Sequence, residues 1–137
     1  MEGKARIIVT ALIKKNGKYL FVRQKKGDIQ QSLWGTPGGK VKLGETPDQA
    51  LIREVREETG LSVKILDFFN GYVMENLHPD YNVPFAILLI YNCKAISDKV
   101  KAFDDVDEYA WFTIPELKKL KLRPGVYLFL DDLEQSI

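Results

Sequence analysis

Residues 39–61, GKVKLGETPDQALIREVREETGL, decide how the rest of the sequence is interpreted. This stretch predicts a helix over residues 47–59, because residue types that favour helix termini stand at both of its ends. They are Thr46 as N-cap, Pro47 at the first helical position, Gln49 to complete a capping box, and Gly60 as a left-handed stop. Both ends are marked independently, so we expect one well-defined central helix.

An acidic stripe runs along this predicted helix. At 100° per residue, three carboxylates share an arc of roughly 100°: Glu54, Glu57 and Glu58. An adjoining apolar face is formed by Leu51, Ile52 and Val55. Solvated glutamates four residues apart repel each other by a few tenths of a kcal/mol, so the stripe calls for positive charge. Either Arg53 and Arg56 balance a solvated acidic surface, or a hard cation such as Mg²⁺ or Mn²⁺ binds there.

Two glycines precede the acidic helix. Gly38 and Gly39 follow Pro37, and a further acid, Glu45, lies at the entry to the helix. Glycines let a backbone carbonyl or amide approach a metal or a phosphate closely. The alternative is a tight turn without a ligand.

Around this centre the sequence predicts strands before and after the helix. Residues 7–13 and 19–22 form a hairpin across the turn signal Asn16-Gly17. Further strands are expected over 62–73, 83–93 and 108–112, and further helices from 114 and over 124–133, with loops over 25–32 and 75–82. Strands around one central helix predict a layered α/β (α+β) domain with a mixed sheet.

Composition limits the function classes. The 137 residues are 45% hydrophobic, and 20 basic residues nearly balance 19 acidic ones, so we expect one domain over residues 1–137 and no binding of double-stranded nucleic acid. The apolar run 7–13 is too short for a membrane or secretory segment. A single cysteine, Cys93, fits a reducing cytoplasm.

The spacing of Gly39, Glu45 and the segment 53–61 resembles the Nudix box in every defined position over residues 39–61. This resemblance implies the α/β/α sandwich of Nudix hydrolases, which cleave nucleoside diphosphates linked to another group and use Mg²⁺ or Mn²⁺. The compact length mildly favours a MutT-like enzyme that acts on nucleoside triphosphates or damaged nucleotides. An ADP-ribose or nucleotide-sugar pyrophosphatase, and an inert nucleotide-binding sensor, are the alternatives.

The resemblance also implies roles for individual residues. Metal ligands would be Glu54, Glu57, Glu58, the Gly38 carbonyl and a further acid, of which Asp105 matches best by spacing among Asp104, Asp105, Asp107 and Glu108. Arg53 would hold the acidic cluster in place, and Glu45 would support the metal. Glu54 is the first choice for the general base, with a loop glutamate as the alternative.

Substrate contacts are expected from three further positions. Gly39 would bring its backbone close to phosphate, and Arg23 is placed like arginines that contact substrate phosphate in relatives. Tyr81 is a candidate for stacking on a base, because it lies in a loop rather than at core spacing. An exposed arginine at a strand end is the alternative for Arg23, and a surface histidine is the simpler interpretation of His78. Relatives are often dimers, so a homodimer is also open.

Overall fold

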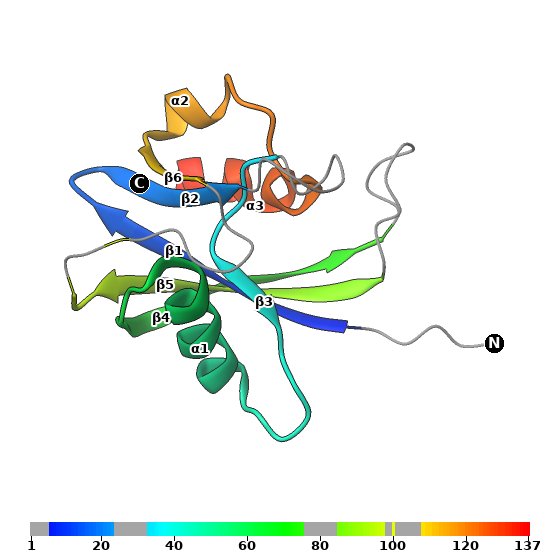
Figure 1. Cartoon of the computed structure of the whole chain (residues 1–137). Coiled ribbons are helices and arrows are strands. Elements are labelled where there is room, and N and C mark those ends of the chain that lie inside the picture. Colours follow the sequence, from blue (N-terminus) through cyan, green and yellow to red (C-terminus); the bar gives the residue numbers. More distant parts are fainter. Residues whose placement is uncertain (1–5, 24–32, 76–84, 98–99, 101–107) are drawn as a thin grey trace.

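The structure is a computed structural model, and it describes residues 6–23, 33–75, 85–97, 100 and 108–137 (Figure 1). Along the chain its elements are β1 (Arg6–Lys15), β2 (Lys18–Arg23), β3 (Gly38–Lys40), α1 (Pro47–Thr59), β4 (Val63–Met74), β5 (Ala86–Ala95), β6 (Glu108–Phe112), α2 (Ile114–Leu117) and α3 (Pro124–Gln135).

The strands form one mixed sheet in the order β4-β5-β1-β2-β6. β1 runs parallel to β5, whereas the other pairs are antiparallel. One edge of β1 is shared between two partners: β3 pairs with its first half, at Ile8–Thr10, and β2 pairs with its end, at Lys14 and Lys15. β2 and β3 thus pair with different parts of the same edge of β1, and β3 lies beside α1.

The two faces of the sheet are covered by different helices, with α1 and α3 on opposite sides (Figure 1). Alternate side chains of β1 enter the two cores, as the period of a strand requires. Val9, Ala11 and Ile13 pack with Leu51 and Val55 of α1, whereas Leu12 packs with Phe129 and Leu133 of α3. The sheet is thus sandwiched between helices, and the α/β/α prediction is confirmed.

Helix α1 begins and ends where the sequence predicts. Thr46 accepts a hydrogen bond from the Gln49 N–H and Gln49 accepts one from the Thr46 N–H, so the capping box is formed. Gly60 ends the helix at φ 74°. The buried face differs from the predicted apolar face, because Ile52 is 36% exposed whereas Ala50 and Thr59 are buried together with Leu51 and Val55.

The remaining elements follow the sequence closely. Asn16 and Gly17 both have positive φ, at 51° and 76°, as the predicted hairpin turn requires. Strand β6 has the predicted bounds, whereas β5 begins three residues later than expected and ends two later, at Ala95. β3 was not expected as a strand. Among the helices of the described ranges, none is both long and apolar enough to cross a membrane.

Candidate metal and nucleotide site

The acidic stripe of α1 lies against β3. The backbone N–H of Gly38 donates to Oε1 of Glu58 at 3.0 Å. The Glu54 carboxylate lies over the α-carbon of Gly39, so closely that a Cβ there would be 2.4 Å from Glu54 Cδ. Only glycine fits at position 39 while Glu54 keeps this position.

The backbone of β3 presents polar groups to the acidic helix. The residues on either side of β3 are hydrogen-bonded to β1: the Val41 N–H donates to the Ile7 carbonyl, and the Pro37 carbonyl accepts from the Ala11 N–H, each at 2.9 Å. In an antiparallel pair every second residue bonds to the partner strand, so Gly38 and Lys40 point their backbone N–H and carbonyl groups away from β1, to the free edge. The Gly38 carbonyl therefore projects from the same edge as its N–H, toward α1.

The side-chain directions of β3 alternate in the same way. Gly39 pairs with Val9 and faces α1, whereas Lys40 pairs with Ile8 on the opposite face. Gly38 also faces that way, and a Cβ there would lie only 3.0 Å from Thr10 Oγ1. β3 therefore forms a thin wall, with the glutamates of α1 on one side and a cavity on the other.

Arg53 connects the acids around this wall. Its guanidinium donates to both carboxylate oxygens of Glu45 at 2.6 and 2.9 Å, and to Glu54 at 2.8 Å. Further bonds of 3.2 Å reach Glu57 and the Lys40 carbonyl. Planar, multidentate contacts of this kind fix geometry as well as charge, so Arg53 positions Glu54 and Glu57 relative to β3.

This network moves the pKa values of its members. Hydrogen bonds from Arg53 and from the Lys42 N–H lower the pKa of Glu45 to about 2, and the hydrogen bonds that Arg53 makes to Glu45 and Glu54 raise the pKa of Arg53. Glu45 thus stays ionised and keeps Arg53 in place. Its position in the structure is beside Arg53, which makes it a support of the cluster.

Glu58 is in a different environment. Desolvation raises its pKa to about 8, and the charges of Glu54 and Glu57 act in the same direction. The Gly38 N–H and the positive charge of Arg123 oppose this shift without cancelling it. Ionised Glu58 is therefore poorly compensated by the chain itself, and a cation near its free oxygen would stabilise it.

The oxygen atoms around β3 and α1 fit a hard divalent cation as ligands. The glutamate carboxylates and the Gly38 carbonyl are all oxygen ligands, which Mg²⁺ and Mn²⁺ prefer, and the absence of a side chain at Gly39 lets the Glu54 carboxylate lie against the backbone of β3. In the described part of the chain, no three acidic, His or Cys side chains are grouped as tightly as a ready-made metal site. The guanidinium of Arg53 lies between carboxylates of this group, and it forms ion pairs with both Glu54 and Glu57.

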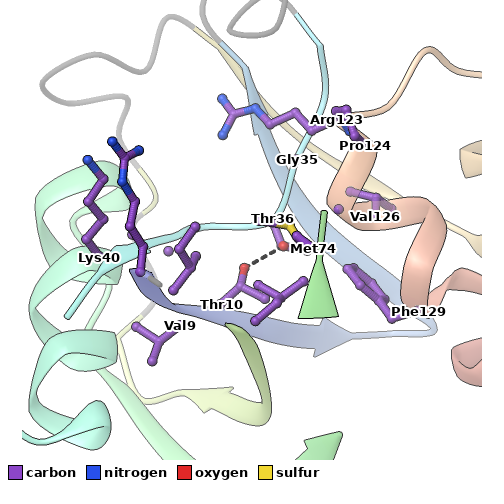
Figure 2. A pocket seen from close by; sticks show the side chains of 16 residues that line it. Val9, Thr10, Gly35, Thr36, Lys40, Met74, Arg123, Pro124, Val126 and Phe129 are labelled. Atoms are coloured by element: carbon purple, nitrogen blue, oxygen red, sulfur yellow. Dashed lines mark hydrogen bonds between the residues drawn. The ribbon is translucent and has the colours of Figure 1, made fainter. Parts of the chain in front are cut away.

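On the other face of β3 lies a cavity of about 370 Å³ between the sheet and the start of α3 (Figure 2). Its apolar wall is formed by Ile8, Met74, Leu88, Val126 and Phe129. Its charged lining residues are all basic: Arg6, Lys40 and Arg123. An apolar interior with a cationic lining suits a ligand that has a flat apolar part and an anionic part, such as a nucleotide.

Two threonines provide the neutral polar groups of this cavity. Thr10 donates to the Pro37 carbonyl at 3.0 Å, and its Oγ1 lies 2.5 Å from that of Thr36, as Figure 2 shows. A hydroxyl has one proton, so Thr36 is the donor in the second bond. The Thr36 oxygen keeps acceptor capacity toward the cavity.

The other predicted residues lie elsewhere or outside the described residues. Arg23 makes a two-pronged contact to Glu108 at 3.0–3.2 Å and stacks over Trp34 at 4.6 Å. It does not line the cavity formed by the described residues, and its role in phosphate binding stays a prediction. Asp105, with the neighbouring Asp104 and Asp107, lies outside the described residues, as do Tyr81 and His78.

Sequence reasoning missed the basic residues of the cavity. The alternation of β1 could have placed Arg6 on the same face as Ile8 and Thr10, because these residues are two apart in a predicted strand. Arg123 had no such signal. Its side chain reaches the Leu33 carbonyl, 90 residues earlier, and packs over Gly35, a contact that only the tertiary fold creates.

Comparison with known proteins shows the family to which this chain belongs. A sequence profile of the NUDIX domain matches residues 3–133. An ADP-ribose pyrophosphatase of Methanocaldococcus jannaschii is 32% identical over 83% of this chain, and the match spans 65% of that relative's length. The nucleoside triphosphatase NudI of Klebsiella pneumoniae is 31% identical over 91% of this chain and 94% of its own length.

Among solved structures, a NUDIX hydrolase from Nitrosomonas europaea superimposes with a TM-score of 0.82 at 27% identity, over 97% of this chain and 90% of its own. The profile match covers nearly the whole sequence. The chain therefore belongs to the Nudix hydrolases, enzymes that act on nucleoside diphosphate derivatives.

Proposed function

We propose that the chain hydrolyses a phosphoanhydride bond of a nucleoside triphosphate or a damaged nucleotide and releases a nucleoside monophosphate and pyrophosphate. The observation that carries this proposal is the position of β3. Its free edge faces the glutamates of α1, and its other face lines a cavity with an apolar interior and basic lining. A nucleotide could place its base in the cavity and its phosphates beside the glutamates.

Nudix hydrolases generally need a divalent metal, and we propose Mg²⁺, or Mn²⁺, for this chain. Glu54, Glu57, Glu58 and the Gly38 carbonyl would hold it, with Asp105 as a further ligand. When bound, such an ion neutralises charge on phosphate oxygens and lowers the pKa of a water.

Residues of the chain would position the metal ligands, accept a proton from the attacking water and contact the phosphates. Arg53 holds Glu54 and Glu57 in position, and Glu45 holds Arg53. Glu54 would accept a proton from the attacking water, because its carboxylate lies at the boundary between α1 and the backbone of Gly39. The backbone at Gly39 would approach the phosphates, while Arg23 and Tyr81 stay proposed substrate contacts.

ADP-ribose or a nucleotide sugar is the second candidate substrate. The relative from Methanocaldococcus jannaschii that is 32% identical is named an ADP-ribose pyrophosphatase. A sensor that binds nucleotide without turnover is the third candidate function. It is disfavoured by the presence of all three box acids, Glu54, Glu57 and Glu58.

A substrate panel tests these alternatives. The purified chain is incubated with Mg²⁺ and with nucleoside triphosphates, ADP-ribose, nucleotide sugars and dinucleoside polyphosphates, and products are separated by anion-exchange chromatography. Monophosphate and pyrophosphate from triphosphates support the proposal. Preferential cleavage of ADP-ribose to AMP and ribose phosphate would replace it, and binding without turnover of any nucleotide would favour the sensor.

The partner of this enzyme is a small nucleotide substrate, and we propose that it works in the cytoplasm as a homodimer. Edge strand β4 supports the dimer, since Leu66, Phe68 and Val73 are more than half exposed on it. Light scattering at several protein concentrations measures the mass directly, and a mass near 15.7 kDa would contradict the dimer.

A further inference from the structure

One basic residue of the cavity, Arg123, is held by the segment that leads to β3. It is half-buried at the N-cap of α3, and its Nε donates to the Leu33 carbonyl at 3.3 Å. The aliphatic part of the side chain lies over Gly35, where a Cβ would be 2.6 Å from Arg123 Cδ. The backbone N–H of Arg123 also donates to the Trp34 carbonyl at 2.8 Å. These contacts restrict a long side chain, so its guanidinium would lose little conformational entropy on binding an anion.

Arg123 lies at the rim of the cavity, on the side that leads to the glutamates of α1. It lines the cavity together with Gly35, and Figure 2 shows its side chain extending over Gly35, away from Phe129 at the apolar end. Gly35 precedes Gly38 by three residues, which span at most about 11 Å, and the Gly38 N–H donates to Glu58. The positive charge of Arg123 also acts to lower the pKa of Glu58, so the two groups are close enough for their charges to interact.

Residues 35–38 connect this rim to Glu58, and they mark the course of a nucleotide bound as proposed. Its base would lie in the apolar part of the cavity and its phosphates beside the glutamates. Only the ribose separates the base from the first phosphate, so a nucleotide that follows residues 35–38 would bring this phosphate to Arg123. A guanidinium has five N–H groups, of which the bond to Leu33 uses one, and it can contact two phosphate oxygens in parallel.

We infer that Arg123 binds the phosphate group that is bonded directly to the nucleoside. This inference rests on the proposed function, from which it takes the orientation of the nucleotide. Nucleoside triphosphates, ADP-ribose and nucleotide sugars all carry this phosphate, so the contact would serve each of these candidate substrates. A cation at this point would also reduce the repulsion between the phosphate and the carboxylate of Glu58. The proposed product, a nucleoside monophosphate, keeps the phosphate and therefore keeps the contact.

A nucleoside monophosphate and its nucleoside test this contact without turnover, because the two ligands differ only in that phosphate. Kd values of the adenosine, guanosine, cytidine and uridine pairs are measured by calorimetry at saturating Mg²⁺, and the pair with the tightest monophosphate is used for the variants. Arg123→Gln is expected to weaken the monophosphate about tenfold or more and the nucleoside less than about twofold. Arg123→Lys keeps the charge, so it should weaken the monophosphate less than Arg123→Gln does.

Lys121→Gln is the control, because it removes one positive charge from an exposed residue two positions earlier. It should leave both Kd values unchanged, and a loss equal to that of Arg123→Gln would overturn the inference in favour of a general attraction of anions. Equal weakening of both ligands by Arg123→Gln would also overturn it, because Arg123 would then only hold residues 33–35 in place.

The direction of the change separates phosphate binding from an effect on the metal site. If Arg123 acted only through Glu58, loss of its positive charge would favour a cation there and tighten the monophosphate. Tighter or unchanged binding of the monophosphate by Arg123→Gln therefore overturns the inference. It is overturned as well if the wild-type chain binds none of the four monophosphates.

The binding experiment and the substrate panel can fail separately. Turnover in the panel decides whether the chain is a pyrophosphohydrolase and which nucleotide it cleaves, whereas the Kd values decide what Arg123 contacts. An active enzyme whose Arg123→Gln variant keeps the monophosphate Kd would contradict only the inference. Selective loss of monophosphate binding in a chain without turnover would contradict only the proposed hydrolysis.

Discussion

The Glu54 carboxylate occupies the space in which a side chain of residue 39 would lie. A Cβ at Gly39 would be 2.4 Å from Glu54 Cδ and 2.6–2.7 Å from its two oxygens. The glycine of β3 and the glutamate of α1 are thus complementary in shape. This contact places the backbone of the cavity wall beside Glu54, one of the proposed metal ligands.

Gly39→Ala is expected to lower kcat/KM by about 10²-fold, which corresponds to roughly 3 kcal/mol, while the fold is kept. The added methyl group would displace Glu54, but Gly39 is not among the glycines with positive φ. Steady-state kinetics and thermal unfolding measure the two effects. Gly71→Ala is the control, because its Cβ would meet neighbours only at 3.6 Å or more. Full activity of Gly39→Ala would contradict the placement of Glu54.

Glu57→Gln is expected to lower the Mg²⁺-dependent rate by about 10²-fold or more, because it removes a charged oxygen ligand. EDTA should abolish activity of the wild-type protein, and added Mg²⁺ should restore it. Titration of Mg²⁺ at fixed nucleotide concentration measures both the maximal rate and the metal requirement. If the variant keeps full activity at low Mg²⁺, Glu57 is not a ligand.

Arg53→Lys is expected to lower activity tenfold or more, because a lysine keeps the charge but cannot bond Glu45, Glu54 and Glu57 together. Arg56→Lys is the matched control on the same helix, since the side-chain contact of Arg56 is a bond to Ser62. kcat and KM are measured separately for both variants. Equal activities would mean that the charge of Arg53 suffices.

The Glu45 carboxylate makes stability depend on acid pH. Its pKa is lowered from 4.5 to about 2 in the folded chain, so between these values the unfolded chain binds more protons. The free energy of unfolding should therefore fall as pH drops from 4.5 toward 2. Glu45→Gln should lose less stability over this range. Urea unfolding at several pH values measures the difference, and parallel curves would contradict it.

Thr59→Val is expected to reduce the free energy of unfolding by about 1–3 kcal/mol. The buried Thr59 hydroxyl donates to the Val55 carbonyl at 2.6 Å and accepts from the Leu61 N–H at 3.2 Å, and valine leaves the Leu61 N–H without this partner. Chemical denaturation gives the change. Thr59→Ser retains the hydroxyl and should lose clearly less; an equal loss would point to packing of the methyl group instead.

Much of the fold could be predicted because its signals are local. The hairpin at Asn16 and Gly17 depends on two residues that accept positive φ, and the bounds of α1 depend on caps within three residues of each end. β3 was not predicted, since a three-residue strand with two glycines has almost no side-chain pattern. It exists because β1 offers a free edge there.

The sequence by itself determined the family, the limits of the central helix and the shared face of Glu54, Glu57 and Glu58, because spacing along one helix fixes these. Only the tertiary structure decided which residues that face contacts. Gly38 and Glu58 are 20 residues apart, and Arg123 reaches Leu33 across 90. Such contacts arise when helices cover two faces of one sheet, and no local signal encodes a distance between segments that far apart.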